Sequence, residues 1–124
     1  MKLIDAHVHL SDAEYTGHID ELVSDAKNAG VTALVTNSMD LQTCQNDVKL
    51  AEKYPNFVYP ALGIHPWNVN VVEDRELEET IDFIQKQKGI VKAIGEIGLD
   101  CKYETIWEKQ TMVFDKMLRL AETL

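Results

Sequence analysis

Four apolar runs, rich in β-branched or aromatic residues, recur along the chain at residues 3–7, 31–37, 57–64 and 90–96. Runs of this length and composition are typical of β-strands. Each run is followed by a segment in which apolar residues recur with the spacing of an amphipathic helix. Strand and helix therefore alternate four times, and this order predicts right-handed βαβ units that build one parallel sheet. We expect an α/β fold.

The ends of the predicted helices follow from capping and helix-stopping residues. Gly30 closes the first helix as the residue after its C-cap, since glycine adopts the left-handed conformation required there. Asp40 is the predicted N-cap of the second helix, and Pro55 stops it. The third helix is predicted to end at Gly89, and the fourth to run from about Trp107 to the C-terminus. No linker separates these segments, so we expect a single domain with one core.

The composition excludes several classes of protein. The hydrophobic content of 45% is that of a globular domain. No apolar run approaches the roughly 20 residues of a membrane span, and no leader precedes the first strand, so we expect no membrane partner and a cytoplasmic location. Cys44 and Cys101 form no CxxC pair, and we interpret both as free thiols, with Cys101 more often buried and neutral than reactive.

The charge balance bears on the partners of the protein. Asp and Glu outnumber Lys and Arg by 21 to 12, which gives a formal net charge of −9. A protein that binds nucleic acid passively carries a basic stripe, so this class is disfavoured. A phosphodiester substrate such as DNA stays open, because a bound metal ion supplies its own positive charge.

Candidate chemistry collects where the predicted strands end. His7 and His9 follow the first strand, His65 the third, and Glu96 the fourth. The carboxyl ends of parallel strands meet at one rim, where the sites of such folds lie. His7 and His9 point to one face if the strand alternates, and Asp5 shares that face. Two imidazoles and a carboxylate are ligands for a divalent metal ion.

Structural interpretations stand beside the functional ones. The two histidines can simply cap a strand end, Glu96 can be a surface or N-cap carboxylate, and His65 a packed loop histidine rather than a substrate or proton-transfer group. Asp100 is typical of a loop or helix cap, and Trp67 either lines a pocket or covers the core. The remaining histidine, His18, is predicted to be at the surface.

Three motifs resemble those of a known family. They are DAHVHL at residues 5–10, ALGIHP at 61–66 and GEIGLD at 95–100. In this order they resemble the TatD family of metal-dependent deoxyribonucleases, a branch of the amidohydrolase superfamily. The resemblance implies a TIM (β/α)₈ barrel that hydrolyses phosphodiester bonds with metal-activated water.

The resemblance also implies a role for each candidate residue. His7 and His9 would hold one divalent ion, which is Mg²⁺, Mn²⁺ or Zn²⁺, and Glu96 would bridge it to a second ion as the catalytic residue. His65 would bind the substrate phosphate. Asp5 is expected to orient these ligands without binding the metal itself.

The chain departs from the family pattern in its extent. It holds four βα units, a (βα)₄ half of the barrel, and lacks the later strands with two further histidines and an aspartate that the family uses. We therefore expect residues 1–124 to form a single truncated TatD-like domain. Its first and fourth strands would be open edges, which predicts self-association as a homodimer or pairing with a missing C-terminal half.

Two other functions remain open at this stage. The same metal arrangement serves amide and lactone hydrolases of the wider superfamily, and the acidic composition favours these over a nuclease. The chain can also be a catalytically inactive half-barrel fragment or assembly module that keeps the motifs without turnover. The sequence leaves the activity of this chain undecided.

Overall fold

The computed structural model describes residues 2–102 and 106–124 of the chain. The strands are β1 (Leu3–Val8), β2 (Val31–Asn37), β3 (Val58–Leu62) and β4 (Ala93–Ile94). The helices are α1 (Ile19–Asn28), α2 (Leu41–Lys53), α3 (Asp74–Lys86) and α4 (Trp107–Thr123), with short 3₁₀ turns η1 (Ala13–Tyr15) and η2 (Pro66–Asn68).

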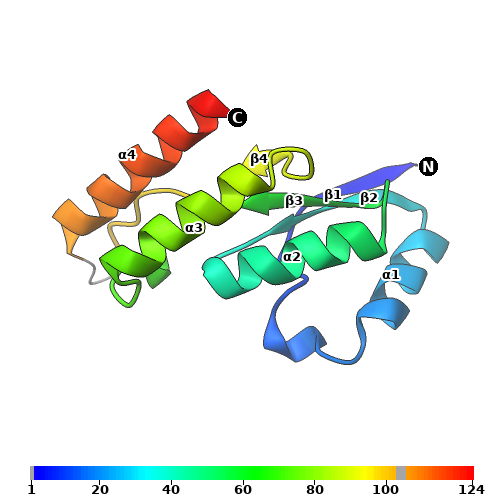
Figure 1. The fold of residues 1–124 in the computed structure, drawn as a ribbon. Coiled ribbons are helices and arrows are strands. Elements are labelled where there is room, and N and C mark those ends of the chain that lie inside the picture. Colours follow the sequence, from blue (N-terminus) through cyan, green and yellow to red (C-terminus); the bar gives the residue numbers. More distant parts are fainter. Residues whose placement is uncertain (1, 103–105) are drawn as a thin grey trace.

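The four strands form one parallel sheet in the order β1-β2-β3-β4. Helices α1, α2 and α3 cover one face of this sheet, and α4 lies beside α3 at the β4 end of the molecule (Figure 1). Each helix leads the chain back to the amino end of the next strand, so the carboxyl ends of the strands meet at one rim. The α/β fold of four βα units is confirmed.

Local sequence accounts for the ends of several elements. The side chain of Asp40 accepts a hydrogen bond from the backbone N–H of Thr43 at 2.8 Å, and the Thr43 hydroxyl accepts one from the backbone N–H of Asp40. This reciprocal pair is a capping box, as the N-cap prediction requires. Gly30 has a φ of 93°, which confirms its place after the C-cap of α1.

Several predicted boundaries are wrong: the first strand ends at Val8 instead of residue 7, and the third spans Val58–Leu62 instead of 57–64. The third helix ends at Lys86 instead of Gly89, because the backbone N–H groups of Ile90 and Val91 bond back to Gln87 and form a turn. The fourth strand spans Ala93–Ile94 only, not 90–96. Ile90 and Val91 are apolar because they pack against the core, not because they pair in the sheet.

The core is a layer between the sheet and its helices. Its buried apolar residues form two adjoining clusters instead of the single one expected, and Ile90 packs against both. Helix α2 contributes to each, with Cys44 and Val48 in one and Ala51 in the other. The division follows from a sheet that has helices on one face, since each helix packs against its nearest strands.

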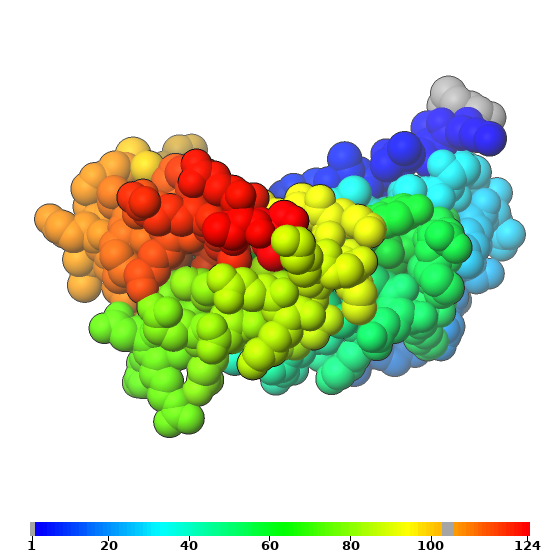
Figure 2. All heavy atoms as spheres, turned by 45° about the horizontal axis from the view of Figure 1, so that its top comes forward, coloured from blue at the N-terminus to red at the C-terminus, as the bar shows by residue number. Residues whose placement is uncertain are grey.

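The other face of the sheet is open. In β2, Leu34 and Thr36 are buried toward the helices, whereas the alternating residues Ala33 and Val35 are partly exposed. At the edge, β1 is exposed along most of its length and its Ile4 keeps 67% of its surface accessible. Figure 2 shows β1, in blue, projecting at one margin of the molecule. Among the described helices, none is long and apolar enough to cross a membrane.

Candidate metal centre

The rim of the sheet holds His7, His9 and Glu96. His7 lies near the end of β1 and His9 follows it, while Glu96 follows β4. Two backbone hydrogen bonds hold the segment at Glu96 to its neighbours: the N–H of Gly95 donates to the carbonyl of Leu62 at 3.0 Å, and the N–H of Glu96 donates to that of Ser38 at 3.1 Å. These backbone bonds bring together side chains that are almost ninety residues apart in the sequence.

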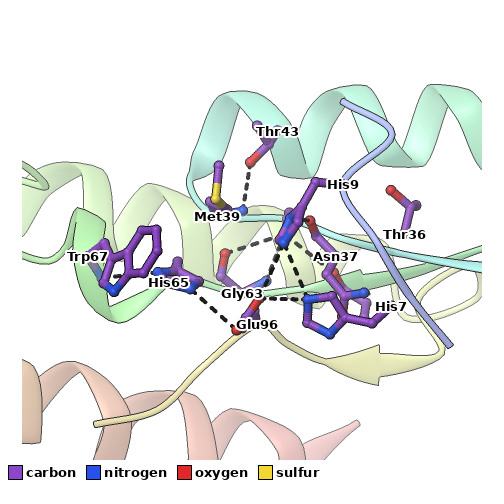
Figure 3. Close-up of polar contacts among 12 residues, drawn as sticks. His7, His9, Thr36, Asn37, Met39, Thr43, Gly63, His65, Trp67 and Glu96 are labelled. Carbon is purple, nitrogen blue, oxygen red and sulfur yellow. Dashed lines mark hydrogen bonds and ion pairs between the residues drawn. The ribbon is translucent and has the colours of Figure 1, made fainter. Parts of the chain in front are cut away.

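The three side chains converge on a common point (Figure 3). The Nε2 atoms of His7 and His9 lie 3.3 Å apart. One carboxylate oxygen of Glu96, Oε2, lies 3.0 Å from the Nε2 of His7 and 3.5 Å from that of His9. The prediction that both strand ends deliver these groups to one place is confirmed as geometry, and their role as metal ligands stays a prediction.

These distances fit a divalent metal ion. Imidazole nitrogens bind such ions at about 2.0–2.1 Å, so ligand atoms at two corners of a tetrahedron around the ion lie about 3.4 Å apart. The three separations of 3.3, 3.0 and 3.5 Å surround this value. The donor set of two nitrogens and one oxygen is also one that Zn²⁺ and Mn²⁺ accept. The residues present therefore fit the ion that the sequence predicts.

A backbone carbonyl orients the ring of His9. Its Nδ1 lies 2.7 Å from the carbonyl oxygen of Asn37, and because a carbonyl can only accept, Nδ1 carries the proton. The lone pair of the neutral ring is then on Nε2, which faces His7 and Glu96. Histidines that bind a metal through one ring nitrogen usually donate the N–H of the other nitrogen to a carbonyl or carboxylate, as His9 does here.

His65 approaches the other oxygen of the same carboxylate. Its Nε2 lies 3.3 Å from Oε1 of Glu96, and its Nδ1 accepts a hydrogen bond from the backbone N–H of Trp67 at 3.1 Å. Burial lowers the pKa of His65, although the charge of Glu96 acts in the opposite direction. The neutral ring with Nδ1 as acceptor carries its proton on Nε2, so in this state His65 is a hydrogen-bond donor rather than a metal ligand.

A glycine allows Glu96 to come this close. A Cβ on Gly63 would meet the side chain of Ile97 at 2.8 Å and the carbonyl oxygen of Glu96 at 2.9 Å. Both distances are shorter than real Cβ contacts. The motif that follows β3 therefore needs glycine for packing, a requirement that the sequence reasoning missed.

Trp67 and Asp100 lie beside His65 at the rim. The indole Nε1 of Trp67 donates to Asp100 at 2.8 Å, and the ring meets His65 edge to face at a centroid distance of 4.8 Å. Asp100 also accepts from the backbone N–H of Lys102, as expected for a loop residue. Trp67 is 49% exposed, so it lines the rim instead of covering the core.

Other predicted positions differ from expectation. Asp5 accepts a hydrogen bond from the backbone N–H of His7, not from its ring. The pairing of β1 with β2 shifts between Asp5 and Val8, so the strand does not alternate strictly as predicted. Cys101 is exposed instead of buried, because its loop lies outside the core, whereas burial raises the pKa of Cys44 to about 12. Both thiols are free, and His18 is exposed, as predicted.

Comparison with known proteins places the chain in a family. Residues 4–124 match the model of the family described as TatD related DNase. The chain belongs to this family. The resemblance predicted from three short motifs is thereby confirmed over almost the whole chain.

The relatives of the chain extend well beyond it. It is 36% identical to an uncharacterized metal-dependent hydrolase of Methanocaldococcus jannaschii, over 100% of this chain and 48% of that protein. It is 32% identical to the human deoxyribonuclease TATDN3, over 98% of this chain and 48% of the relative. The crystal structure of YJJV, a TatD homolog of Escherichia coli K12, superposes with a TM-score of 0.88 at 30% identity, covering 98% of this chain and 47% of that one.

The chain therefore spans about half the length of the relatives that it matches. Its four parallel strands correspond to half of the TatD TIM barrel, as predicted.

Proposed function

We propose that this chain binds a divalent metal ion through His7, His9 and Glu96 and contributes it to the hydrolysis of phosphodiester bonds in DNA. The observation that carries the proposal is the convergence of these three side chains on one point at the rim. The names of the relatives, a metal-dependent hydrolase and a deoxyribonuclease, agree with it.

Each residue of the site would have a separate role in metal binding. His7 and His9 would hold the ion through their Nε2 atoms, and Oε2 of Glu96 would be the third ligand atom. The second oxygen of Glu96, Oε1, faces His65, and through it Glu96 would bind a second ion. A bound divalent ion supplies positive charge and makes water acidic enough to become a nucleophile near neutral pH.

His65 would contact the substrate. Its Nε2–H faces Oε1 of Glu96 in this structure. If a second ion took up that oxygen, the same N–H would be released to donate to an oxygen of the phosphate. The lowered pKa of His65 keeps the ring neutral, so it orients the phosphate by hydrogen bonding rather than by charge. With a formal net charge of −9, the chain depends on bound cations to attract an anionic substrate.

One observation favours a second candidate, the hydrolysis of an amide or lactone. The acidic surface repels DNA, whereas a neutral amide or lactone is not repelled. The same ligands also serve to polarise a carbonyl group. The assay that follows therefore includes both substrate classes.

The test compares hydrolysis by the wild-type chain and by Glu96→Gln. We expect Mn²⁺-dependent cleavage of a single-stranded oligonucleotide, and a loss of at least about 100-fold in Glu96→Gln because the neutral amide cannot serve as an anionic ligand. His18→Ala, which alters an exposed histidine outside the rim, should cleave at the wild-type rate. Cleavage of an amide or lactone panel without cleavage of the oligonucleotide would favour the second candidate, and metal binding without any hydrolysis would favour an assembly module.

A further inference from the structure

A buried carboxylate lies behind the metal centre and takes no part in the proposed reaction. Asp47 belongs to α2, and its side chain has no exposed surface. Its Oδ1 accepts hydrogen bonds from the hydroxyls of Ser11 and Thr36, the latter at 2.8 Å. Its Oδ2 has no hydrogen-bond partner among the described residues.

These bonds lead to the segment that carries His9. The Oγ1 of Thr36, which donates to Asp47, also accepts from the backbone N–H of Leu10 at 3.2 Å. Asp47 therefore holds Ser11 directly and Leu10 through Thr36, and these are the two residues that follow His9. His9 itself is bonded to the carbonyl of Asn37, the neighbour of Thr36 in β2.

The carboxylate is costly at this position. Burial raises the pKa of Asp47 to about 6, although the bonds from Ser11 and Thr36 lower it. His9 and Asp12 are the other charged groups that act on it, in opposite directions. An apolar residue would fit the same face of α2, where Cys44 and Val48 are buried, without any desolvation cost. Packing alone therefore does not account for an acid here.

We propose that Asp47 is a positioning residue for the metal centre. By holding Ser11 and Thr36, it fixes the backbone that leaves β1 and so directs the Nε2 of His9 toward Glu96. The inference rests on the proposed function in that the group positioned is a metal ligand. It extends to residues that touch neither the ion nor the substrate.

The test uses two substitutions of Asp47 in the full chain. Asp47→Leu fills a similar volume without an acceptor, and we expect Mn²⁺ affinity, measured by calorimetry on the folded protein, to fall about 10-fold, as for other groups that support metal ligands. Asp47→Asn keeps the Oδ1 acceptor and should restore the affinity to within about 3-fold of wild type. Thr80→Val is the control, since Thr80 is equally buried but lies in α3 and bonds only to Glu76 among the described contacts.

A second measurement needs no metal. Hydrogen exchange at the Leu10 amide, relative to exchange in α3, should accelerate in Asp47→Leu and stay unchanged in Asp47→Asn and Thr80→Val. If Asp47→Leu does not fold, Ser11→Ala removes one of the two hydroxyl contacts. It should lower Mn²⁺ affinity about 3-fold, less than the loss of a group that supports a ligand directly, because Thr36 still connects Asp47 to Leu10.

The outcomes separate this inference from the proposed function. A wild-type chain that binds no Mn²⁺ refutes the metal site, and the Leu10 exchange then still decides whether Asp47 fixes the segment after His9. Equal Leu10 exchange and equal Mn²⁺ affinity in wild type and a folded Asp47 or Ser11 variant would overturn the positioning role. A loss of unfolding free energy with no change in either reading would mean that Asp47 is structural only.

Discussion

At the scale of single residues, Glu96 can approach His7 and His9 because position 63 is a glycine, which has no side chain. The space beside Gly63 is filled by Ile97 and by the backbone of Glu96. A methyl group there must displace the segment that delivers the carboxylate, because packed interiors do not yield by more than a few tenths of an ångström. The site thus rests on the chain path after β3 as well as on its ligands.

Substituting Gly63→Ala should harm both stability and metal binding. We expect the free energy of unfolding to fall by about 1–3 kcal/mol, the usual cost of overpacking, together with weaker Mn²⁺ binding. Gly89→Ala is the matched control, since a Cβ on Gly89 meets nothing within 4 Å, and it should change stability by less than about 0.5 kcal/mol. Urea denaturation and calorimetry measure the two effects, and equal behaviour of the two variants would contradict the argument.

The candidate metal ligands could be predicted from the sequence, whereas Asp47, which holds the segment that follows His9, could not. His7, His9 and Glu96 could be predicted because each ends or follows an apolar run, and parallel strands bring such positions to one rim. Asp47 was missed, although one clue existed: it lies three residues after Cys44 and four before Ala51, on the apolar face of α2. The partners of such a residue come from other elements, so spacing within its own helix cannot reveal them.

At the scale of elements, prediction worked where local patterns and tertiary packing agree. The bounds of β2 and the first residue of α4 are as predicted, and the capping box at Asp40 was visible as a helix start. The short β4 was not, because apolar residues that fill a core and those that pair in a sheet have the same composition. The shift in β1 between Asp5 and Val8 also depends on its pairing with β2, which no local pattern encodes.

At the scale of the whole molecule, the open side of the sheet is the outstanding feature. The sheet order leaves β1 and β4 as its two edges, and a partly exposed apolar face lies between them. We propose that a second copy of the chain covers this face. A twofold axis along the strands would place β4 of one copy beside β1 of the other, running in the same direction, and so satisfy both edges.

Sedimentation velocity at micromolar concentration tests this proposal. We expect a dimer that strengthens with added salt, because two chains with a formal net charge of −9 repel each other. Ile4→Lys, at an exposed position of β1, should weaken the dimer, whereas Val71→Lys, 77% exposed in the loop before α3, should not. A stable monomer at all salt concentrations would contradict it, and capture by a separate chain that supplies the other half of the barrel would assign the open face to that partner.

The account as a whole depends on a metal ion held by ligands from β1 and β4, and titration with Mn²⁺ in a calorimeter tests this most directly. The double substitution His7→Ala and His9→Ala removes two of the three converging donors, while His18→Ala removes an exposed imidazole whose described side-chain partner is Glu21. We predict that binding is abolished in the first variant and unchanged in the second. Unchanged Mn²⁺ affinity in the double variant would contradict the central claim.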